Sequence, residues 1–359
     1  MDIGGTFTDV VLLDAGTQQL QFGKVSTTPA DPSDGFFRGV ETALSHGHNN
    51  IVQAIFHGST VATNAVLEQK GSRVGLLVTQ GFRDMLEIGR AYIPGIFTNY
   101  MRWAKPERLV PLERVREIPE RLAADGSVVR PLNEGAARDA IADLLQHDIE
   151  SLAISLLHSY TNPAHERRAE ELVHNIAPDL FVSRSSDVLP EYREYERTMT
   201  IVLNAYIMPA VDRYLRCIED GLTARGFTAE MKIMRSDAGV MSLAAARRRP
   251  VNTVLSGPAG GVSGATYVAA AAGYPNIVTL DMGGTSTDVC LSTQGEPRLS
   301  TDTWVSQYPI KVPIVDVTTI GAGGGSIALV SSSGAVRVGP ESAGADPGPV
   351  CYGRGELSR

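Results

Sequence analysis

Two acidic, glycine-containing octapeptides are the most chemically informative feature of this sequence. Asp2–Asp9 reads DIGGTFTD and Asp281–Asp288 reads DMGGTSTD, so six of the eight positions are identical. Paired glycines let a backbone turn tightly and present its N–H groups to an anion, and the threonines add hydroxyl donors. An aspartate beside such a loop would repel a phosphate unless a divalent cation lay between them. The octapeptides therefore predict a nucleotide site with magnesium.

The simpler interpretation is two unrelated glycine turns, since a single Gly-Gly turn between strands is common. The repetition argues against it, because ordinary turns would accept Asn or Ser at several of the shared positions. Apolar β-forming residues follow each copy, at 10–13 and 289–291, and they also precede the second copy at 276–280. Each copy is therefore predicted to form the tip of a β-hairpin.

A further candidate site lies where a predicted strand at 51–56 meets a predicted helix that runs to about Lys70. The free N–H groups and the positive potential at a helix N-terminus favour a phosphate or a polar substrate there. Ser59 or Thr60 could equally serve only as a helix cap, and both interpretations stay open. The substrate-contacting candidates in this segment are His57, Ser59, Thr60, Thr63 and Asn64.

Two glycine-rich segments complete the candidate residues. Ser256 and Gly257 lie between a predicted strand at 251–255 and a predicted helix, where further glycines would let a substrate approach. The alternative is that this segment only starts the helix, since proline is common in the first turn of a helix. The loop at 321–326 is flexible enough to clamp a nucleotide, although a linker would look similar. Its candidate residues are Gly323, Gly324 and Gly325.

The elements that must position these residues follow an α/β pattern. Strand, helix and strand alternate over 51–79, which is typical of a βαβ unit with parallel strands. The pattern loosens at 91–133, where an insertion is predicted. One long helix is predicted over 191–226, with a kink or a break at Pro209. The charged residues at the start of this helix are predicted to form ion pairs on its solvent-exposed face; they are Glu191, Arg193, Glu194, Glu196 and Arg197.

Length and composition narrow the class of protein. At 359 residues the chain is too long for one ordinary core, and two domains with a helical connector are predicted: 1–180, 181–230 and 231–359. The formal net charge of -8 argues against nucleic acid or an anionic membrane as the main partner. No apolar stretch is long enough to span a bilayer, so a cytoplasmic location is expected. Three scattered cysteines predict neither a disulfide framework nor a zinc site.

Paired Asp-x-Gly-Gly-Thr hairpins in two halves resemble the superfamily of actin, sugar kinases and heat-shock chaperone ATPases. The fold that this resemblance implies is α/β, with two ribonuclease-H-like domains in the actin-like ATPase architecture and a central cleft for Mg-ATP. Further blocks narrow the resemblance to the hydantoinase A / 5-oxoprolinase family. These blocks are 2–11, 57–68, 189–197, 255–261, 279–289, 319–327 and 339–353.

The family resemblance implies ATP-dependent hydrolysis of a cyclic amide, such as 5-oxoproline or a hydantoin, with ATP and Mg2+ as cofactors. Relatives also serve as subunits of acetone-type carboxylases, and the sequence leaves that alternative open. A non-catalytic ATP-binding module is a third interpretation. The partner implied by the resemblance is a hydantoinase B-type subunit or domain.

The resemblance also assigns roles to the two octapeptides. Asp2 and Asp281 would be catalytic and would orient magnesium and its waters, whereas Asp9 and Asp288 would brace the hairpins or form a second metal shell. The residues implied to hold phosphates are Gly4, Gly5, Thr6, Thr8, Gly283, Gly284, Thr285 and Thr287.

The sequence departs from the family pattern at both ends. Family members usually carry several residues of strand before the first aspartate, whereas here Met1 alone precedes it. They also continue well beyond the Cys-Tyr-Gly-Arg block at 351–354. We therefore expect a shortened first strand and an incomplete second domain.

Overall fold

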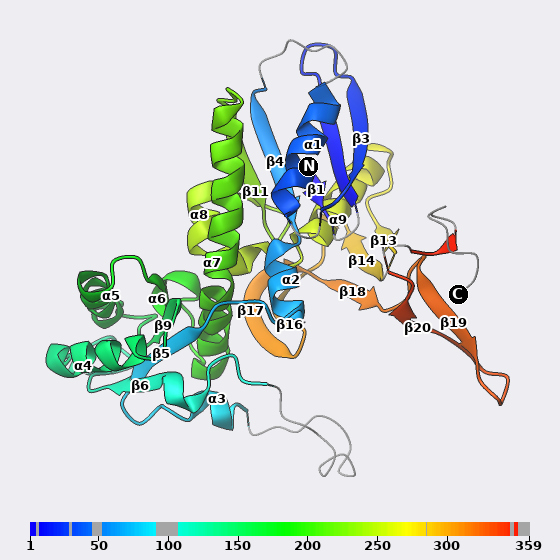
Figure 1. Cartoon of the computed structure of the whole chain (residues 1–359). Helices are drawn as coiled ribbons and strands as arrows, with labels where there is room; N and C mark the ends of the chain where they lie inside the picture. Colours follow the sequence, from blue (N-terminus) through cyan, green and yellow to red (C-terminus); the bar gives the residue numbers. More distant parts are fainter. Residues whose placement is uncertain are drawn as a thin grey trace.

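The computed structural model describes residues 1–4, 7–28, 31–44, 52–90, 107–284, 286–344 and 348–350. Within these ranges the strands form one six-stranded sheet, two four-stranded sheets and three two-stranded ones. One long helix, α7 (Glu194–Ala224), runs between the larger sheets (Figure 1). The fold is therefore of the mixed α/β class, as the sequence predicts.

The first sheet has the strand order β12-β11-β4-β1-β2-β3. β1, β2 and β3 are antiparallel neighbours, whereas β4 and β11 run parallel to β1. The segment predicted to open the second domain, at 231–236, forms β11 and so belongs to this first sheet. Its strands are β1 (Asp2–Ile3), β2 (Phe7–Leu13), β3 (Leu20–Ser26), β4 (Ala54–Ser59), β11 (Glu230–Met234) and β12 (Val240–Ser242).

The second sheet is an insertion between the strands of the first. Its order is β10-β9-β5-β6, and all of its neighbouring strands are parallel. Both central strands are buried along their whole length, which explains their unbroken apolar runs. The strands are β5 (Val74–Thr79), β6 (Val115–Ile118), β9 (Ser151–Ser155) and β10 (Phe181–Arg184), with the helices α3 (Met85–Ile88), α4 (Glu134–Leu145), α5 (Ala164–Ile176) and α6 (Ser185–Val188) and the small hairpin β7 (Arg121–Leu122) and β8 (Val128–Arg130).

Helix α7 joins the two sheets. The predicted helix over 191–226 is confirmed, and it continues through Pro209 without a break. It contacts β9 and β10 of the second sheet, and it contacts α1 (Pro32–Leu44) and α2 (Val61–Leu67) beside the first. The prediction that all its charged residues face solvent is wrong for Arg197, which is 1% exposed. The reason is that this end of α7 packs on β9, and Arg197 Nη2 donates to the Leu156 carbonyl at 2.9 Å.

The predicted strand at 251–255 is also wrong, because Pro250–Thr253 forms a 3-10 helix. Its apolar residues Val251 and Val254 are buried, and Asn204 of α7 accepts a hydrogen bond from the Val251 N–H at 3.1 Å. The apolar run therefore reflects packing rather than a β-strand. Helix α8 (Leu243–Arg248) precedes this segment and α9 (Ser256–Ala271) follows it.

The remaining strands form a smaller sheet and two hairpins. The predicted second hairpin is confirmed as β13 (Ile277–Met282) and β14 (Thr287–Thr293). Two further strands, β15 (Glu296–Pro297) and β18 (Val317–Ile320), pair with β14 in the same sheet. The hairpin β16 (Leu299–Val305) and β17 (Tyr308–Val315) returns to pack on α7, and β19 (Ser326–Val330) pairs with β20 (Val336–Ser342). Among the described residues, no helix combines the length and apolar content needed to cross a bilayer.

Candidate functional site

The two octapeptides fold into equivalent hairpins. Asp2 lies opposite Asp9 across the first hairpin, and Asp281 lies opposite Asp288 across the second. The turns also match, because Gly4 N–H donates to the Phe7 carbonyl at 3.0 Å and Gly283 N–H donates to the Ser286 carbonyl at 2.9 Å. The sequence repeat is therefore a structural repeat that extends to register and hydrogen bonding.

Helix α9 begins between the two hairpins. A Cβ built on Gly257 would lie 3.4 Å from Asp2 Oδ1, and one built on Gly261 would lie 3.9 Å from Asp281 Oδ2. These glycines are four residues apart, so they lie on the same face of the helix. The first turns of α9 therefore present bare backbone to both aspartates, together with the positive end of the helix dipole.

The carboxyl group of Asp2 is electrostatically perturbed. Desolvation by its surroundings raises its pKa above the ordinary value of 3.8, and the negative charges of Asp9 and Asp281 raise it further, against the opposing effect of the N-terminal ammonium. Asp281 is therefore close enough for its negative charge to contribute to raising the pKa of Asp2. A cation placed between them would relieve this repulsion.

The carboxyl end of β4 lies beside Asp2 and, with the segments at 59–64 and 255–257, forms one wall of the site. A Cβ built on Gly58 would lie only 2.9 Å from Asp2 Oδ1, so a side chain at this position would displace the carboxylate. Sequence reasoning missed Gly58 and Gly261, although a glycine at a strand end and a second glycine one helical turn after Gly257 were available signals. Both leave open space beside a repeat aspartate.

Several predicted substrate residues converge on this wall. The Thr60 hydroxyl donates to the Ile3 carbonyl at 3.1 Å, which ties α2 to β1. Thr63 Oγ1 accepts a hydrogen bond from Leu255 N–H at 3.0 Å, and the Ser256 hydroxyl lies 3.4 Å from the Ser59 carbonyl. The segments at 59–64 and 255–257 are therefore brought together. Thr60, at the start of α2, makes no side-chain capping hydrogen bond, so the simple cap interpretation does not describe it.

His57 is placed differently from its predicted neighbours. Its side chain is fully buried, its Nε2 lies 2.8 Å from the Tyr214 hydroxyl, and desolvation lowers its pKa to about 3. Tyr214 also hydrogen-bonds to the side chain of Ser59. His57 is therefore a neutral core residue behind the wall and not a group exposed to substrate. Asn64 likewise bonds within the wall, to Thr60 Oγ1 at 3.3 Å.

The predicted phosphate-binding hydroxyls are used internally where the structure describes them. Thr8 is fully buried and its Oγ1 lies 3.1 Å from Thr27 Oγ1, whereas the Thr287 hydroxyl donates to the Ala322 carbonyl at 2.6 Å. Gly4, Gly283 and Gly284 lie in the hairpin turns. Gly5, Thr6 and Thr285 lie outside the described residues.

The loop at 321–326 packs on the tip of the second hairpin. Gly324 N–H donates to the Gly283 carbonyl at 2.9 Å, and Gly325 N–H donates to the Gly284 carbonyl at 2.6 Å. A Cβ on Gly323 would lie 2.7 Å from the Gly283 carbonyl oxygen, which no side chain tolerates. These glycines therefore serve a close backbone contact. None of their three N–H groups is free for a nucleotide, because Gly323 N–H also donates, to Ser326 Oγ at 2.8 Å.

The outer aspartates of the hairpins have protein partners. Asp9 forms an ion pair with Lys24 at 2.6 Å, and Asp288 accepts a hydrogen bond from the Thr319 hydroxyl at 2.6 Å. Within the part of the chain that the structure describes, no three His, Cys, Asp or Glu side chains gather closely enough to hold a metal ion. The four repeat aspartates therefore do not form one metal cluster in this part of the chain.

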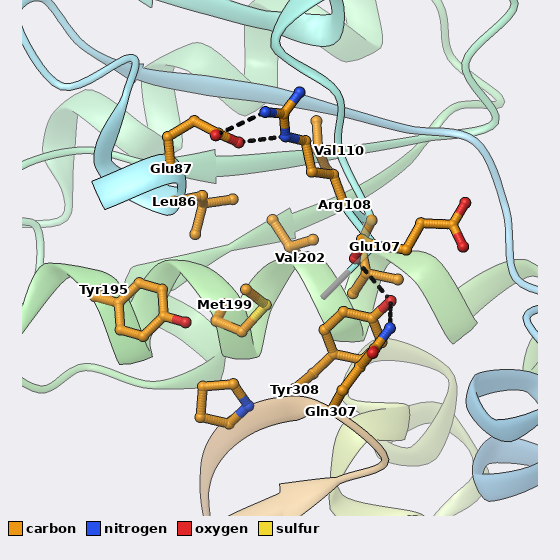
Figure 2. A pocket seen from close by; sticks show the side chains of 12 residues that line it. Leu86, Glu87, Glu107, Arg108, Val110, Tyr195, Met199, Val202, Gln307 and Tyr308 are labelled. Carbon is orange, nitrogen blue, oxygen red and sulfur yellow. Dashed lines mark hydrogen bonds and ion pairs between the residues drawn. The ribbon is translucent and has the colours of Figure 1, made fainter. Parts of the chain in front are cut away.

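A separate pocket lies between α3, α7 and the turn of the β16–β17 hairpin (Figure 2). Glu87 and Arg108 form an ion pair at its rim, and the Tyr308 hydroxyl donates to the Glu107 carbonyl at 3.0 Å. None of the predicted site residues lines it. Its apolar lining comes from Leu86, Leu109, Val110, Met199, Val202 and Pro309.

Solved structures show the same fold. The ATP-dependent caprolactamase from Pseudomonas jessenii superposes with a TM-score of 0.86 at 39% identity, over 98% of this chain and 52% of that one. Nucleotide-free acetone carboxylase superposes with a TM-score of 0.82 at 33% identity, over 96% of this chain and 50% of that one. 5-Oxoprolinase 1 of Arabidopsis thaliana is 36% identical over 99% of this chain and 30% of its own length.

The chain spans about half the length of the caprolactamase and carboxylase chains that it matches. The hydantoinase/oxoprolinase N-terminal region matches residues 1–177, and the hydantoinase/oxoprolinase domain matches residues 197–358. Each of these two ranges contains one of the two hairpins. The chain belongs to the hydantoinase/oxoprolinase family.

Proposed function

We propose that this chain forms the ATP-binding part of an enzyme that uses ATP to hydrolyse a cyclic amide. The observation that carries the proposal is the pair of equivalent hairpins, whose aspartates Asp2 and Asp281 flank the first turns of α9. Two carboxylates beside bare glycine backbone suit a metal-bound polyphosphate.

The proposed architecture is that of the actin-like ATPases. The first sheet joins three antiparallel strands to the parallel strands β4 and β11, and the second hairpin with β15 and β18 repeats the antiparallel part. The nucleotide would lie in a central cleft between the two ribonuclease-H-like units. We propose two domains, at 1–180 and 231–359, joined by the helical segment 181–230; the second domain would begin within β11, which pairs with β4 of the first sheet.

The residues present fit a magnesium ion. Magnesium is usually held by one or two carboxylates together with substrate phosphates and waters, and Asp2 and Asp281 would be those carboxylates. Gly58 and Gly257 leave the space beside Asp2 free of side chains. When bound, the ion would neutralise charge that develops on the phosphates. Asp9 and Asp288 would brace the hairpins through Lys24 and Thr319.

The proposed role of the chain in the reaction is to hold ATP and the amide in position. Transfer of the γ-phosphoryl group from ATP to the amide oxygen, with release of ADP, would make the ring carbon electrophilic. A first water would add to this carbon, and the ring C–N bond would break to give a free amine and an acyl phosphate. A second water would then hydrolyse the acyl phosphate to the carboxylate and free phosphate. No protein nucleophile is required for this sequence of steps.

The N–H groups of Gly4 and Gly283 already donate within their turns, so the phosphates would approach the hairpin turns with Gly284 as the backbone donor. The wall at Ser59, Thr60, Thr63, Ser256 and Gly257 would hold the amide.

The relatives include proteins named for amides and proteins named for ketones, at overlapping sequence identities. The ATP-dependent caprolactamase is 39% identical to the chain, whereas the acetone carboxylase beta subunit of Xanthobacter autotrophicus is 34% identical. Both names denote subunits, and we propose that this chain also works with a partner, of the hydantoinase B type. A cytoplasmic location stays a prediction.

The test is ATP hydrolysis by the complete enzyme that contains this chain, measured as phosphate release. We expect 5-oxoproline, hydantoin or caprolactam to stimulate hydrolysis by at least about tenfold, equivalent to about 1.4 kcal/mol. Stimulation by acetone with bicarbonate instead would assign the chain to a carboxylase. Nucleotide binding without stimulation by any of these compounds would identify a non-catalytic module.

A further inference from the structure

One hydroxyl group of helix α7 reaches the end of β4 that borders the site. Tyr214 Oη lies 2.8 Å from His57 Nε2, and it also hydrogen-bonds to the side chain of Ser59. His57 and Ser59 are two positions apart on β4, so their side chains lie on the same face of the strand. The Tyr214 hydroxyl therefore bonds to β4 on both sides of Gly58.

Gly58 is the residue of β4 that lies against Asp2. Its N–H donates to the Met1 carbonyl at 2.9 Å, and the Thr60 N–H donates to the Ile3 carbonyl at 3.2 Å. These two hydrogen bonds join β4 to β1 on both sides of Asp2. A Cβ built on Gly58 would lie 2.9 Å from Asp2 Oδ1. The Asp2 carboxylate therefore lies directly against the main chain of β4, and its position depends on that of Gly58.

The ionisation of Tyr214 and His57 lets both hydrogen bonds form at once. Burial raises the pKa of the Tyr214 hydroxyl, and the negative charges of Asp31 and Asp2 raise it further. Tyr214 therefore stays protonated at neutral pH, where its hydroxyl can donate one hydrogen bond and accept another. His57 is neutral under the same conditions, because desolvation lowers its pKa to about 3. The effect of Asp2 on the pKa of Tyr214 also shows that the two residues are near each other.

The two partners of Tyr214 are held by other elements of the fold. Ser59 Oγ accepts a hydrogen bond at 3.1 Å from the N–H of Val61, the first residue of α2. The His57 ring lies edge-on to the Phe36 ring of α1, with ring centroids 5.3 Å apart. Tyr214 itself is 7% exposed. Three helices therefore meet at the end of β4, and the Tyr214 hydroxyl links this strand end to α7.

We propose that Tyr214 is a positioning residue that fixes the Asp2 carboxylate through Gly58. Without the hydroxyl, Ser59 and His57 lose their shared partner and the end of β4 gains freedom to move. The Asp2 carboxylate then moves with Gly58, and small displacements of a charged group in a site are costly. The inference rests on the proposed function in one respect, since it takes Asp2 to hold a metal-bound nucleotide.

A double-mutant cycle tests whether Tyr214 acts through Asp2. The complete enzyme that contains this chain is prepared with Tyr214→Phe, with Asp2→Asn and with both substitutions. The Kd of Mn2+ in the presence of ATP is measured for each by electron paramagnetic resonance. We expect Tyr214→Phe to raise this Kd at least about tenfold in the otherwise unchanged enzyme, but less than about twofold in the Asp2→Asn enzyme. A hydroxyl that only stabilised the fold would give the same factor in both.

Hydrogen exchange of the metal-free enzyme gives a second measurement. The Gly58 amide should exchange with deuterium at least about tenfold faster in Tyr214→Phe, because the end of β4 opens more often. Tyr206→Phe is the matched control, since Tyr206 is also a buried tyrosine of α7 but packs against Gly71. We expect this control to change neither the exchange of Gly58 nor the Kd of Mn2+.

Ser59→Ala is a second variant that keeps the hydrogen bond between Tyr214 and His57. It answers the same question if circular dichroism shows that Tyr214→Phe does not fold. We expect Ser59→Ala to raise the Kd of Mn2+ at least about threefold, and again to have less than about twofold effect in the Asp2→Asn enzyme. No cyclic amide is present in this measurement, so a direct contact of Ser59 with the substrate does not enter it.

Equal factors in the two halves of the cycle overturn the proposal, and so does unchanged exchange of the Gly58 amide. An effect of Tyr206→Phe as large as that of Tyr214→Phe overturns it as well. All three outcomes leave the proposed function intact. An enzyme that binds Mn2+ and ATP but is not stimulated by any cyclic amide contradicts the proposed function instead, and the cycle still decides the role of Tyr214. Absence of Mn2+ and ATP binding contradicts both.

Discussion

At the scale of single residues, the two repeat aspartates and the glycines around them define the site. The sequence predicts Asp2 and Asp281 as candidate site residues, because the octapeptide repeats them with their glycines. Gly58 and Gly261 are visible in the sequence as glycines, but only the fold places the end of β4 and the second turn of α9 beside those carboxylates. His57 failed as a site residue because polarity alone does not distinguish a buried histidine from an exposed one.

Asp281→Asn should lower ATP turnover of the complete enzyme by at least about a hundredfold, because it removes one of the two charges available to a metal. Asp281 keeps part of its surface exposed, so its unfolding transition should change little. Phosphate release and thermal unfolding measure the two effects. Asp9→Asn is the matched control, since Asp9 pairs with Lys24 at the surface, and unchanged turnover in Asp281→Asn would show that the hairpin is structural.

Gly58→Ala should reduce turnover while leaving the protein folded. The added Cβ would lie 2.9 Å from Asp2 Oδ1 and would force the carboxylate away from its position. Gly264→Ala is the control, because Gly264 lies in α9 with no other group within 4 Å, and alanine there should stabilise the helix by about 0.5–1 kcal/mol. Equal activity of both variants would contradict a role for the Asp2 position.

Asp2 should make stability depend on pH. Desolvation raises its pKa, so the folded protein keeps the proton at a pH where the unfolded chain has lost it. The free energy of unfolding therefore falls as pH rises from the ordinary value of 3.8 through the raised pKa. Asp2→Asn should remove this part of the dependence and slightly raise the melting temperature at neutral pH. Thermal unfolding of both proteins across this range measures it, and a lower melting temperature in Asp2→Asn would contradict the assignment.

At the scale of elements, long periodic segments and most short apolar strands were predicted well, but their pairing was not. β4 and β5 form as strands yet lie in different sheets, so the βαβ pair predicted over 51–79 does not form. The helix over 191–226 and the second hairpin have strong patterns, and both form. The run at 251–255 has the composition of a strand but folds as a 3-10 helix against α7, since tertiary packing overrides a short local preference. The placement of β11 in the first sheet could not be predicted either. β11 pairs with β4, which lies far away in the sequence, and such long-range pairing leaves no local sequence pattern.

Arg197→Ala should destabilise the protein by about 2–4 kcal/mol, because Arg197 is buried and pins α7 to the second sheet. Its guanidinium donates to the Leu156 and Glu191 carbonyls and stacks on Tyr160. Chemical denaturation measures the change. Arg193→Ala, at an exposed position of the same segment, should change stability by less than about 0.5 kcal/mol, and similar values for both variants would show that Arg197 is not a structural anchor.

At the scale of the whole molecule, the two hairpins reach one site from different sheets, and α9 lies between them. The inserted second sheet has a core of its own, formed by residues such as Leu77, Ile141 and Leu152. Nothing in that core contacts the repeat aspartates. A ligand held by both hairpins should therefore couple the first sheet to the β13–β14 sheet and leave the inserted sheet unaffected.

Hydrogen exchange of the complete enzyme with Mg-ATP measures this coupling. We expect slower exchange in both hairpins at once, at 2–9 and 281–288, because under the proposed function each would supply one carboxylate to the same ion. Saturation at a hundredfold excess over Kd should stabilise the bound protein by about 2.7 kcal/mol. β5 and β9 are the internal control, since both are already buried and lie outside the site. Protection confined to one hairpin would mean that the repeat holds two separate ligands or none, and Asp2 and Asp281 would then have to be assigned separate roles.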